Sequence, residues 1–279
     1  MQTVPVRLLG DADRAAVERL LDLEPYAAAQ VAERVAAAGL SWRRLEARVF
    51  GYGERGRLGS VCWLGANLIP VRAGRAARAA YAELVASEPR TCSSLVGDAD
   101  AVLDLWDRLS PSWGPARDVR TCQPLLAVDT APSTPADPDV RLVRPDEVDV
   151  LYPAAVAMYT EEVGISPVAD GGEGVYRERV RDLVGGGRAY ARIVDGKVVF
   201  KAELAVITRH TAQVQGVWTA PEWRGRGIGT AGMAAVVRDA LVRTAPTVSL
   251  YVNDYNHAAQ LVYARCGFRR VGTFATVLF

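Results

Sequence analysis

The segment 224–229 has the sequence Arg-Gly-Arg-Gly-Ile-Gly and carries the strongest chemical signal in the chain. A predicted strand precedes it, and a predicted amphipathic helix begins near Gly227. Successive backbone N–H groups at a helix start carry partial positive charge, and glycine lets the backbone approach an anion closely. Arg224 and Arg226 add positive charge. The segment therefore predicts a turn that binds a diphosphate.

Two other kinds of phosphate-binding turn are excluded by the same residues. The chain has no Gly-Lys-Ser or Gly-Lys-Thr, which a P-loop requires. A dinucleotide-binding turn would follow the first strand of its domain, whereas this one follows the fourth predicted strand. An ordinary glycine-rich turn without a ligand remains the alternative.

The spacing of this turn resembles the acetyl-CoA signature of the GNAT superfamily. That signature has Gln or Arg, two residues, Gly, one residue, and then Gly or Ala, and Arg224, Gly227 and Gly229 occupy these places. The resemblance implies that acetyl-CoA is the co-substrate and that the backbone of the preceding strand pairs with its pantetheine. The implied cofactor-binding residues are Val217, Trp218, Thr219, Arg224, Gly225, Arg226, Gly227, Ile228, Gly229 and Thr230.

A second resemblance to the same superfamily covers residues 253–268. In that family an asparagine at the position of Asn256 commonly contacts the cofactor, and a tyrosine at the position of Tyr263 often protonates the leaving thiolate. A phenol suits this role because its pKa, about 10, lies above that of a thiol. The alternatives are that Asn256 caps a helix and that Tyr263 only packs on the partner strand of its helix.

The general base is not identified by the resemblance. Many relatives carry a glutamate on the fifth strand, and Tyr251 stands at that place. The base is either a water molecule or another acid. The candidate acids are Glu161 and Glu162, at the end of a predicted helix, and Glu203 on a predicted strand. Solvated acids at a helix end are the alternative for the first two. A surface ion pair with Lys201 is the alternative for Glu203, because the two side chains share one face of the strand.

The C-terminal half has the predicted order β-α-α-β-β-β-α-β-α-β. Apolar periodicity and turn residues place strands at 140–143, 189–194, 198–206, 213–219, 248–252 and 268–278. Helices are predicted at 145–163, 175–183, from 227 to before Pro246, and at 256–265. Asp195-Gly196 predicts a two-residue hairpin turn.

The N-terminal half has a similar predicted layout, which indicates an internal repeat. Strands are predicted at 6–9, 47–51, 58–64, 92–96 and 119–127, with helices ending near Leu21 and spanning 75–86 and 102–109. Its counterpart of the phosphate turn, residues 68–77, has no pair of glycines and includes Pro70, which has no N–H to donate. We therefore expect a degenerate half and one acetyl-CoA per chain.

The proline-rich segment 131–138 predicts a linker between a degenerate domain at 1–130 and a catalytic domain at 139–279. The expected fold class is α/β, with two GNAT-like domains in tandem. Each would have a central twisted, mostly antiparallel mixed sheet flanked by helices. The chain resembles an actinobacterial-type tandem protein, similar in layout to the mycothiol synthases, and their substrate is not transferred to it.

Composition narrows the class of protein. A net charge of +1 argues against a dedicated nucleic-acid binder, and no apolar run is long enough for a membrane span. Four scattered cysteines and two histidines indicate no metal site. With no export signal, the sequence predicts a cytoplasmic protein whose thiols are free. A homo-oligomer is neither indicated nor excluded.

The sequence therefore predicts an acetyl-CoA-dependent N-acetyltransferase whose acceptor is a primary amine of a small molecule or a protein. Two alternatives stay open. The missing glutamate on the fifth strand favours a regulatory acyl-CoA-binding module without turnover. An interaction scaffold, in which the N-terminal half recruits a partner, would bind no CoA ester.

Overall fold

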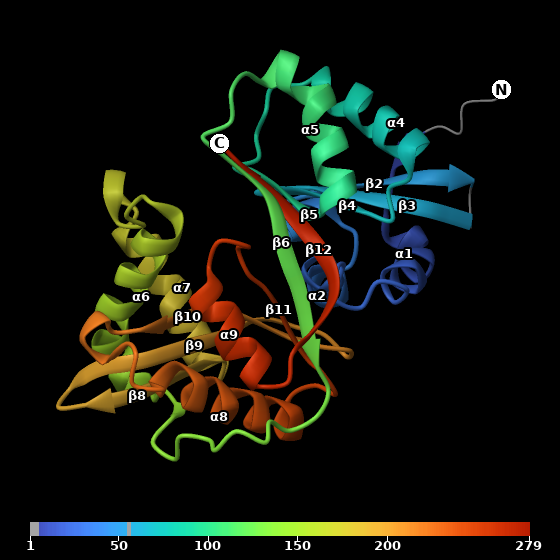
Figure 1. Cartoon of the computed structure of the whole chain (residues 1–279). Coiled ribbons are helices and arrows are strands. Elements are labelled where there is room, and N and C mark those ends of the chain that lie inside the picture. Colours follow the sequence, from blue (N-terminus) through green and yellow to red (C-terminus); the bar gives the residue numbers. More distant parts are fainter. Residues whose placement is uncertain (1–5, 55–56) are drawn as a thin grey trace. The chain divides into compact units, whose positions relative to one another are not determined.

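The computed structural model describes residues 6–54 and 57–279, which form two compact units (Figure 1). The first unit comprises the chain up to Leu126 together with Tyr251–Asn256 and Arg270–Phe279. The second comprises Ala127–Leu250 and His257–Arg269. The chain therefore passes between the units more than once.

The first unit contains a mixed sheet with the strand order β1-β2-β3-β4-β5-β12-β6. Its strands are β1 Val6–Leu8, β2 Arg48–Glu54, β3 Arg57–Leu64, β4 Asn67–Val71, β5 Ser94–Asp98, β6 Asp118–Val128 and β12 Arg269–Leu278. Its helices are α1 Arg14–Leu21, α2 Ala29–Ala38, α3 Trp42–Leu45, α4 Arg75–Ala86 and α5 Ala99–Trp113.

Helices cover both faces of this sheet because side chains alternate along each strand. On β3, Val61 and Trp63 pack in one apolar cluster with residues of α1 and α2. Cys62 and Leu64 pack in the other cluster, with residues of α4 and α5. Both faces are thus buried, which explains the continuous apolar run at residues 61–64 of β3.

The second unit has the strand order β11-β10-β9-β8-β7. Its strands are β7 Arg141–Leu142, β8 Ala189–Val194, β9 Lys197–Ile207, β10 Ala212–Thr219 and β11 Val248–Tyr251, whose last residue groups with the first unit. Its helices are α6 Val148–Val163, α7 Glu173–Gly185, α8 Ile228–Arg243 and α9 His257–Arg265.

Two pairs of helices enclose the sheet of the second unit (Figure 1). The helices α6 and α7 pack on β8 through a cluster that includes Tyr152, Tyr176 and Ala191. On the other face α8 approaches β9 so closely that a Cβ on Gly232 would lie 2.7 Å from the ring of Phe200. Glycine at this position lets α8 lie directly on the sheet.

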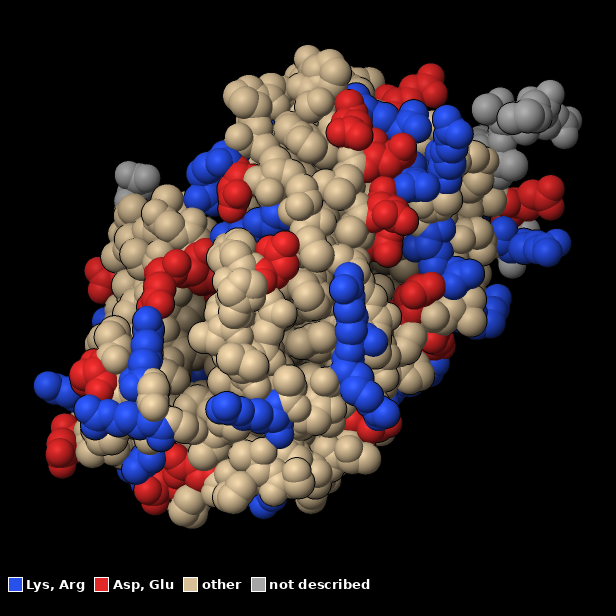
Figure 2. Space-filling model, viewed as in Figure 1, with Lys and Arg blue, Asp and Glu red and all other residues tan. Residues whose placement is uncertain are grey.

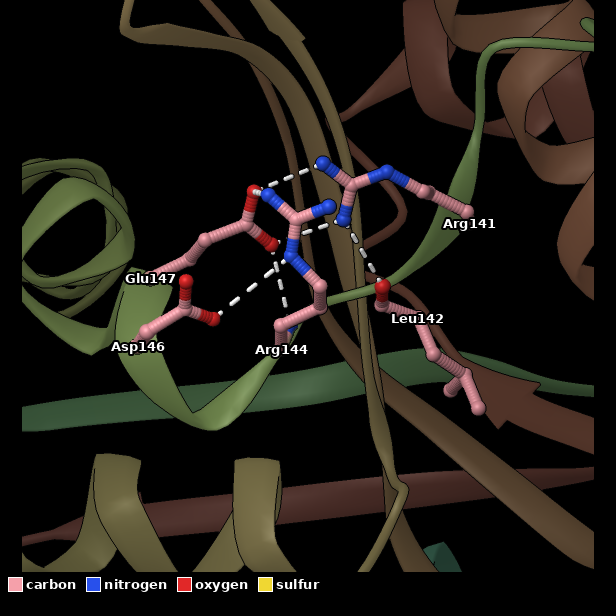
Figure 3. A network of polar contacts seen from close by, with 5 residues as sticks. All are labelled: Arg141, Leu142, Arg144, Asp146 and Glu147. Carbon is pink, nitrogen blue, oxygen red and sulfur yellow. Dashed lines mark hydrogen bonds and ion pairs between the residues drawn. The ribbon is translucent and has the colours of Figure 1, made fainter.

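The start of α6 is fixed by the buried carboxylate of Glu147 (Figure 3). Both nitrogens of the Arg141 fork donate to it at 2.7 Å, and the backbone N–H of Arg144 donates at 2.9 Å. Hydrogen bonds from Arg141 are the main reason that the pKa of Glu147 falls to about 2. This network ties β7 to the helix whose far end enters the candidate site.

The predicted internal repeat is confirmed by the strand topology. In the first unit β4 pairs in parallel with β5, and in the second β10 pairs in parallel with β11. Each of these parallel pairs follows a run of antiparallel strands and is connected through a helix, α4 or α8. The final strand differs, since β12 pairs with β5 of the first unit. The sequence-based division at residues 131–138 assigned this strand to the C-terminal domain.

Most predicted elements of the C-terminal half are confirmed, including β8 at its predicted bounds. The hairpin at Asp195-Gly196 has φ values of 49° and 72°, as a primed turn requires. In the N-terminal half the sequence analysis missed α2, α3 and β4. It took residues 68–77 for a loop, whereas Leu68 to Val71 belong to β4.

Charged groups of both signs are interspersed on the face shown in Figure 2. None of the described helices combines the length and the apolarity that a membrane span requires. Within residues 6–54 and 57–279, no group of three or more His, Cys, Asp or Glu side chains could hold a metal ion.

Candidate functional site

The turn between β10 and α8 has the conformation that its glycines predict. Gly225 and Gly227 have φ values of 74° and 80°, in the left-handed region that glycine favours, and Gly227 caps α8. Within the described residues, no hydrogen-bond acceptor is found for the backbone N–H groups of residues 225–230. These donors lie at the positive end of a long helix, a place where backbone N–H groups can bind an anion. We call residues 225–230 the cradle.

Packing explains why Gly229 is a glycine. A Cβ at this position would lie 3.3 Å from Oγ1 of Thr219 and 3.8 Å from Cγ2 of Val262. The first turn of α8 therefore lies close to both the end of β10 and α9. A larger side chain would have to occupy the space between these three elements.

The two arginines of the turn differ in their surroundings. Arg224 donates from Nε to the carbonyl of Thr219 at 2.9 Å and from its terminal nitrogen to Glu161 at 2.8 Å. Arg226 lies over the ring of Trp223, 5.5 Å from the ring centroid. The charge of Arg224 is thus already paired. No described acid forms an ion pair with Arg226, so it supplies positive charge beside the cradle.

An open groove of about 460 Å³ adjoins the start of α8. One wall is the turn itself, and the other walls come from the predicted linker, from β8 and from the end of α9. Its lining residues are Thr134, Pro135, Asp137, Arg192, Arg226, Gly227, Ile228, Thr230, Ala231 and Arg265. The sequence analysis did not identify the linker, Arg192 or Arg265 as parts of a site.

The strands β10 and β11 are paired only at their beginnings. Ala212 pairs with Val248 and Gln213 with Ser249, and no later pair between them is found among the described residues. Farther along, β10 also departs from regular pairing with β9, because the two residues Gly216 and Val217 lie opposite one residue of β9. The backbone of this stretch is therefore the part of the sheet that a ligand can pair with.

Glu203 lies beneath this irregular stretch of β10. Its carboxylate contacts Nζ of Lys201 at 3.2 Å and the guanidinium of Arg179 at 2.9 Å. Burial alone would raise the pKa of Glu203, but the positive charges of Lys201 and Arg179 lower it below its ordinary value. The two side chains share one strand face, as predicted. That face is buried beneath α7, however, so the expected surface ion pair is a buried one.

Glu161 and Glu162 have different surroundings at the end of α6. Glu161 accepts hydrogen bonds from Trp218 at 3.2 Å and from Arg224 at 2.8 Å. The hydrogen bond from Arg224 is the main reason that the pKa of Glu161 falls below its ordinary value. Glu162 is exposed, and its negative charge contributes to raising the pKa of the Tyr263 phenol. Of the three predicted acids, Glu162 is thus the one that the structure relates to Tyr263.

Tyr263 is 7 % exposed and stands on α9 with its ring against that of Phe268. Burial is the main reason that its pKa is raised above the ordinary value of a phenol, and the charge of Glu162 adds to this. The group therefore keeps its proton at neutral pH. Because the pKa of a thiol lies below that of a phenol, transfer of this proton to a thiolate is uphill and requires the sulfur to be in hydrogen-bond contact with Tyr263.

Residues 251–256 connect β11 to α9 and belong to the first unit. Tyr251 packs on Phe274 with ring centroids 5.2 Å apart, so it takes a core position. Asn253 is buried and accepts from Gln123 at 2.8 Å. Asn256 is exposed and immediately precedes α9, the helix that carries Tyr263. Its predicted contact with the cofactor stays a prediction.

The N-terminal half has no comparable turn. The segment between β4 and α4 consists only of residues 72–74, whereas residues 220–227 separate β10 from α8. Arg72 forms an ion pair with Glu24 at 2.7 Å, so its charge is already neutralised by an acid. Moreover, β4 pairs with β3 without the register shifts that β10 shows. The features of the candidate site are thus confined to the second half of the repeat.

Two residues of the site could have been found in the sequence. A glycine inside a strand often marks a bulge, which is what Gly216 does in β10. Arg179 lies three residues after Tyr176 and one before Val180, which are both buried on the inner side of α7. Helical spacing therefore places Arg179 beside that inner side.

Family models match both halves of the chain. A model described as the acetyltransferase (GNAT) family matches residues 151–268, and a model described as a domain of unknown function (DUF4081) matches residues 47–151. No curated protein matches the chain significantly. The match to the acetyltransferase (GNAT) family covers the cradle, the end of α6 and Tyr263.

Solved structures match nearly the whole chain at low sequence identity. A GNAT acetyltransferase from Colwellia psychrerythraea has a TM-score of 0.58 and 13 % identity, covering 98 % of this chain and 99 % of its own. A GCN5-related N-acetyltransferase from Sphaerobacter thermophilus has a TM-score of 0.59 and 16 % identity, covering 98 % of this chain and 94 % of its own. A tandem GNAT protein from the clavulanic acid biosynthesis pathway has a TM-score of 0.51 and 17 % identity, covering 98 % of this chain and 97 % of its own.

These structures show a shared fold, and the acetyltransferase (GNAT) family model adds a match in sequence over residues 151–268. The match begins within α6 and ends after α9, so it includes β10, α8 and α9 but not the linker residues that line the groove. The tandem neighbour has the same doubled architecture. The chain is a tandem GNAT-fold protein that carries an acetyltransferase domain of the GNAT family over residues 151–268.

Proposed function

We propose that this protein transfers the acetyl group of acetyl-CoA to a primary amine. The observation that carries the proposal is the turn at residues 225–230, whose backbone N–H groups face no acceptor in the described chain. Such a cradle at a helix start suits the diphosphate of CoA. The irregular stretch of β10 supplies backbone groups of Val217, Trp218 and Thr219 for the pantetheine.

Acetyl transfer forms an amide bond and breaks the thioester C–S bond. The amine nitrogen attacks the thioester carbonyl, and the thiolate of CoA leaves. A base takes the proton that the ammonium group must lose, and we assign this role to Glu162. Tyr263 gives its proton to the thiolate. Because the reaction joins two bound molecules, holding them in contact contributes most of the rate enhancement.

Glu162 is preferred over the other predicted acids because it is the one whose charge acts on Tyr263, the proposed proton donor. Glu203 is buried and paired with two cations, and Glu161 is held by Arg224. A carboxylate whose pKa is lowered in this way is a weaker base. Glu162 is exposed, so it can exchange protons with solvent, and it acts on Tyr263.

The decisive experiment measures binding and turnover together. Calorimetric titration with acetyl-CoA should saturate at one molecule per chain, and Arg224→Ala combined with Gly227→Val should abolish binding. Consumption of acetyl-CoA with a panel of primary amines, followed by mass spectrometry, should identify an acetylated acceptor. Binding without turnover on any amine would favour a regulatory acyl-CoA-binding module. A failure to bind any CoA ester would favour an interaction scaffold.

The proposal includes the cytoplasm as the place of action. Acetyl-CoA is available there, and the described cysteines Cys62, Cys92, Cys122 and Cys266 are all free thiols.

A further inference from the structure

Lys201 is almost completely buried inside the second unit. Its side chain is 1 % exposed, and Lys197 at the exposed start of the same strand is the only other lysine of the chain. A buried ammonium costs much free energy unless it is paired and hydrogen-bonded. The partners of Lys201 therefore indicate what its charge is used for.

One partner is the backbone at the irregular stretch of β10. Nζ of Lys201 donates to the carbonyl oxygen of Gly216 at 2.9 Å. Gly216 has a φ of 58°, and a Cβ there would lie only 2.8 Å from Nζ. The lysine and the glycine are thus matched, because the ammonium occupies the space that any side chain at residue 216 would need.

The other partner is Glu203, which keeps the ammonium in place. Its Oε2 lies 3.2 Å from Nζ, while its Oε1 accepts from Arg179 at 2.9 Å. A carboxylate between two cations fixes the position of both. The chain of contacts thus runs from α7 through β9 to the backbone of β10.

This contact determines the orientation of one peptide group. A trans peptide is planar, so its C=O and N–H point in opposite directions. Because the Gly216 carbonyl points at Lys201, the N–H of Val217 points away from it. The first half of the repeat has neither the register shift of β10 nor a glycine in β4. The arrangement therefore occurs together with the cradle and not in the degenerate half.

We propose that Lys201 is a positioning residue for the acyl-CoA site, which holds the Gly216 carbonyl and thereby orients the Val217 N–H for the bound thioester arm. This inference rests on the proposed function and adds a residue to it. Lys201 touches neither substrate. Its effect passes through the backbone of β10, which is separate from the diphosphate cradle at residues 225–230.

The test compares two ligands in the full-length protein. Acetyl-CoA spans both the cradle and β10, whereas adenosine 3′-phosphate 5′-diphosphate lacks the pantetheine and the acyl group. Lys201→Met should raise the Kd of acetyl-CoA at least 10-fold and leave the Kd of the fragment within about threefold. Lys197→Met is the matched control, and we expect it to change neither value.

A second variant guards against a folding defect caused by an unpaired buried charge. In Lys201→Met combined with Glu203→Met, both members of the buried pair become apolar, a replacement that proteins often tolerate. Arg179 is half-exposed, so it can turn to solvent. Circular dichroism and gel filtration would show that this variant is folded, and its acetyl-CoA affinity should again fall at least 10-fold.

Three results would overturn the inference. These are an acetyl-CoA Kd within threefold of the wild type in either folded variant, an equal loss for both ligands, and unfolding of both variants. The last two would show that the network only maintains the fold. A wild-type protein that binds no acetyl-CoA would instead overturn the proposed function. The two failures are distinguishable, because this one is seen in the protein without any substitution.

Discussion

Arg224 is the first residue of the predicted diphosphate signature, and it donates a hydrogen bond to Glu161 at 2.8 Å. Glu161 was predicted as a candidate base, so one contact joins two residues that were assigned to different roles. The pair links the end of α6 to the turn before α8. It also places a carboxylate beside a site that we propose for an anion.

Glu161→Gln and Glu162→Gln should have different effects. Removing the charge of Glu161 frees the Arg224 guanidinium, so the affinity for acetyl-CoA should rise about 1.5- to 5-fold, the range of an exposed ion pair. Removing the base at Glu162 should lower kcat by roughly 10²- to 10⁴-fold. Steady-state kinetics and calorimetry on both variants measure this, and a collapse of kcat in Glu161→Gln would reverse the two assignments.

Gly227→Val should weaken acetyl-CoA binding by at least about 10-fold, which corresponds to the loss of one hydrogen bond to a charged group. A β-branched side chain is strained at a φ of 80°, so the turn must change conformation. Gly185→Ala is a suitable control, because Gly185 lies in α7 with a negative φ and open space around it. Unchanged affinity in a folded Gly227→Val protein would refute the cradle.

Tyr263→Phe should lower turnover by roughly 10²-fold and leave the affinity for acetyl-CoA within a few fold, because only the proton donor is lost. The aromatic ring and its contact with Phe268 remain. The substitution Tyr26→Phe in the first unit controls for the loss of a phenol elsewhere. Equal turnover in the wild type and Tyr263→Phe would leave Tyr263 with a packing role only.

Glu147→Gln should destabilise the fold by about 1–3 kcal/mol at neutral pH, because hydrogen bonds to a charged group are lost. The pKa of Glu147 is about 2 in the folded state and near 4.5 ordinarily. Its stabilising effect is therefore present above pH 4.5 and is lost as the pH falls toward 2. Urea unfolding should show that the difference between wild type and variant shrinks over this range. Glu178→Gln, at an exposed ion pair, should show little difference at any pH.

The sequence allowed the second unit to be predicted well, because its signals are local. Alternating and helical periodicities, Asp195-Gly196 and the glycines of the turn each determine the structure where they occur. In the first unit β4 was missed because residues 68–77 were interpreted as the counterpart of the phosphate turn. The strand tolerates Pro70 opposite Cys62 of β3. The helix α2 was missed although Val31 and Val35, one turn apart, are both buried on its inner side.

Other features depend on tertiary contacts that no local pattern specifies. Alternation along β9 places Lys201 and Glu203 on one face, but only the packing of α7 shows that this face is buried. The hydrogen bonds of Glu161 join residues far apart in the sequence. Similarly, the pattern of residues 268–278 predicts a strand without indicating its neighbour, and the structure pairs that strand with β5.

The pairing of β5 with β12 has a consequence for the order of folding. Ser94 pairs with Leu278 and Asp98 with Phe274, so this edge of β5 lacks its partner until the residues after 273 have been synthesised. Contacts between such distant residues form slowly, because a long loop must close first. An unpaired strand edge is meanwhile a site for aggregation. The N-terminal half therefore depends on a strand made after the elements of the second unit to complete its sheet. During translation the open edge of β5 needs protection from aggregation for longer than the length of that half suggests.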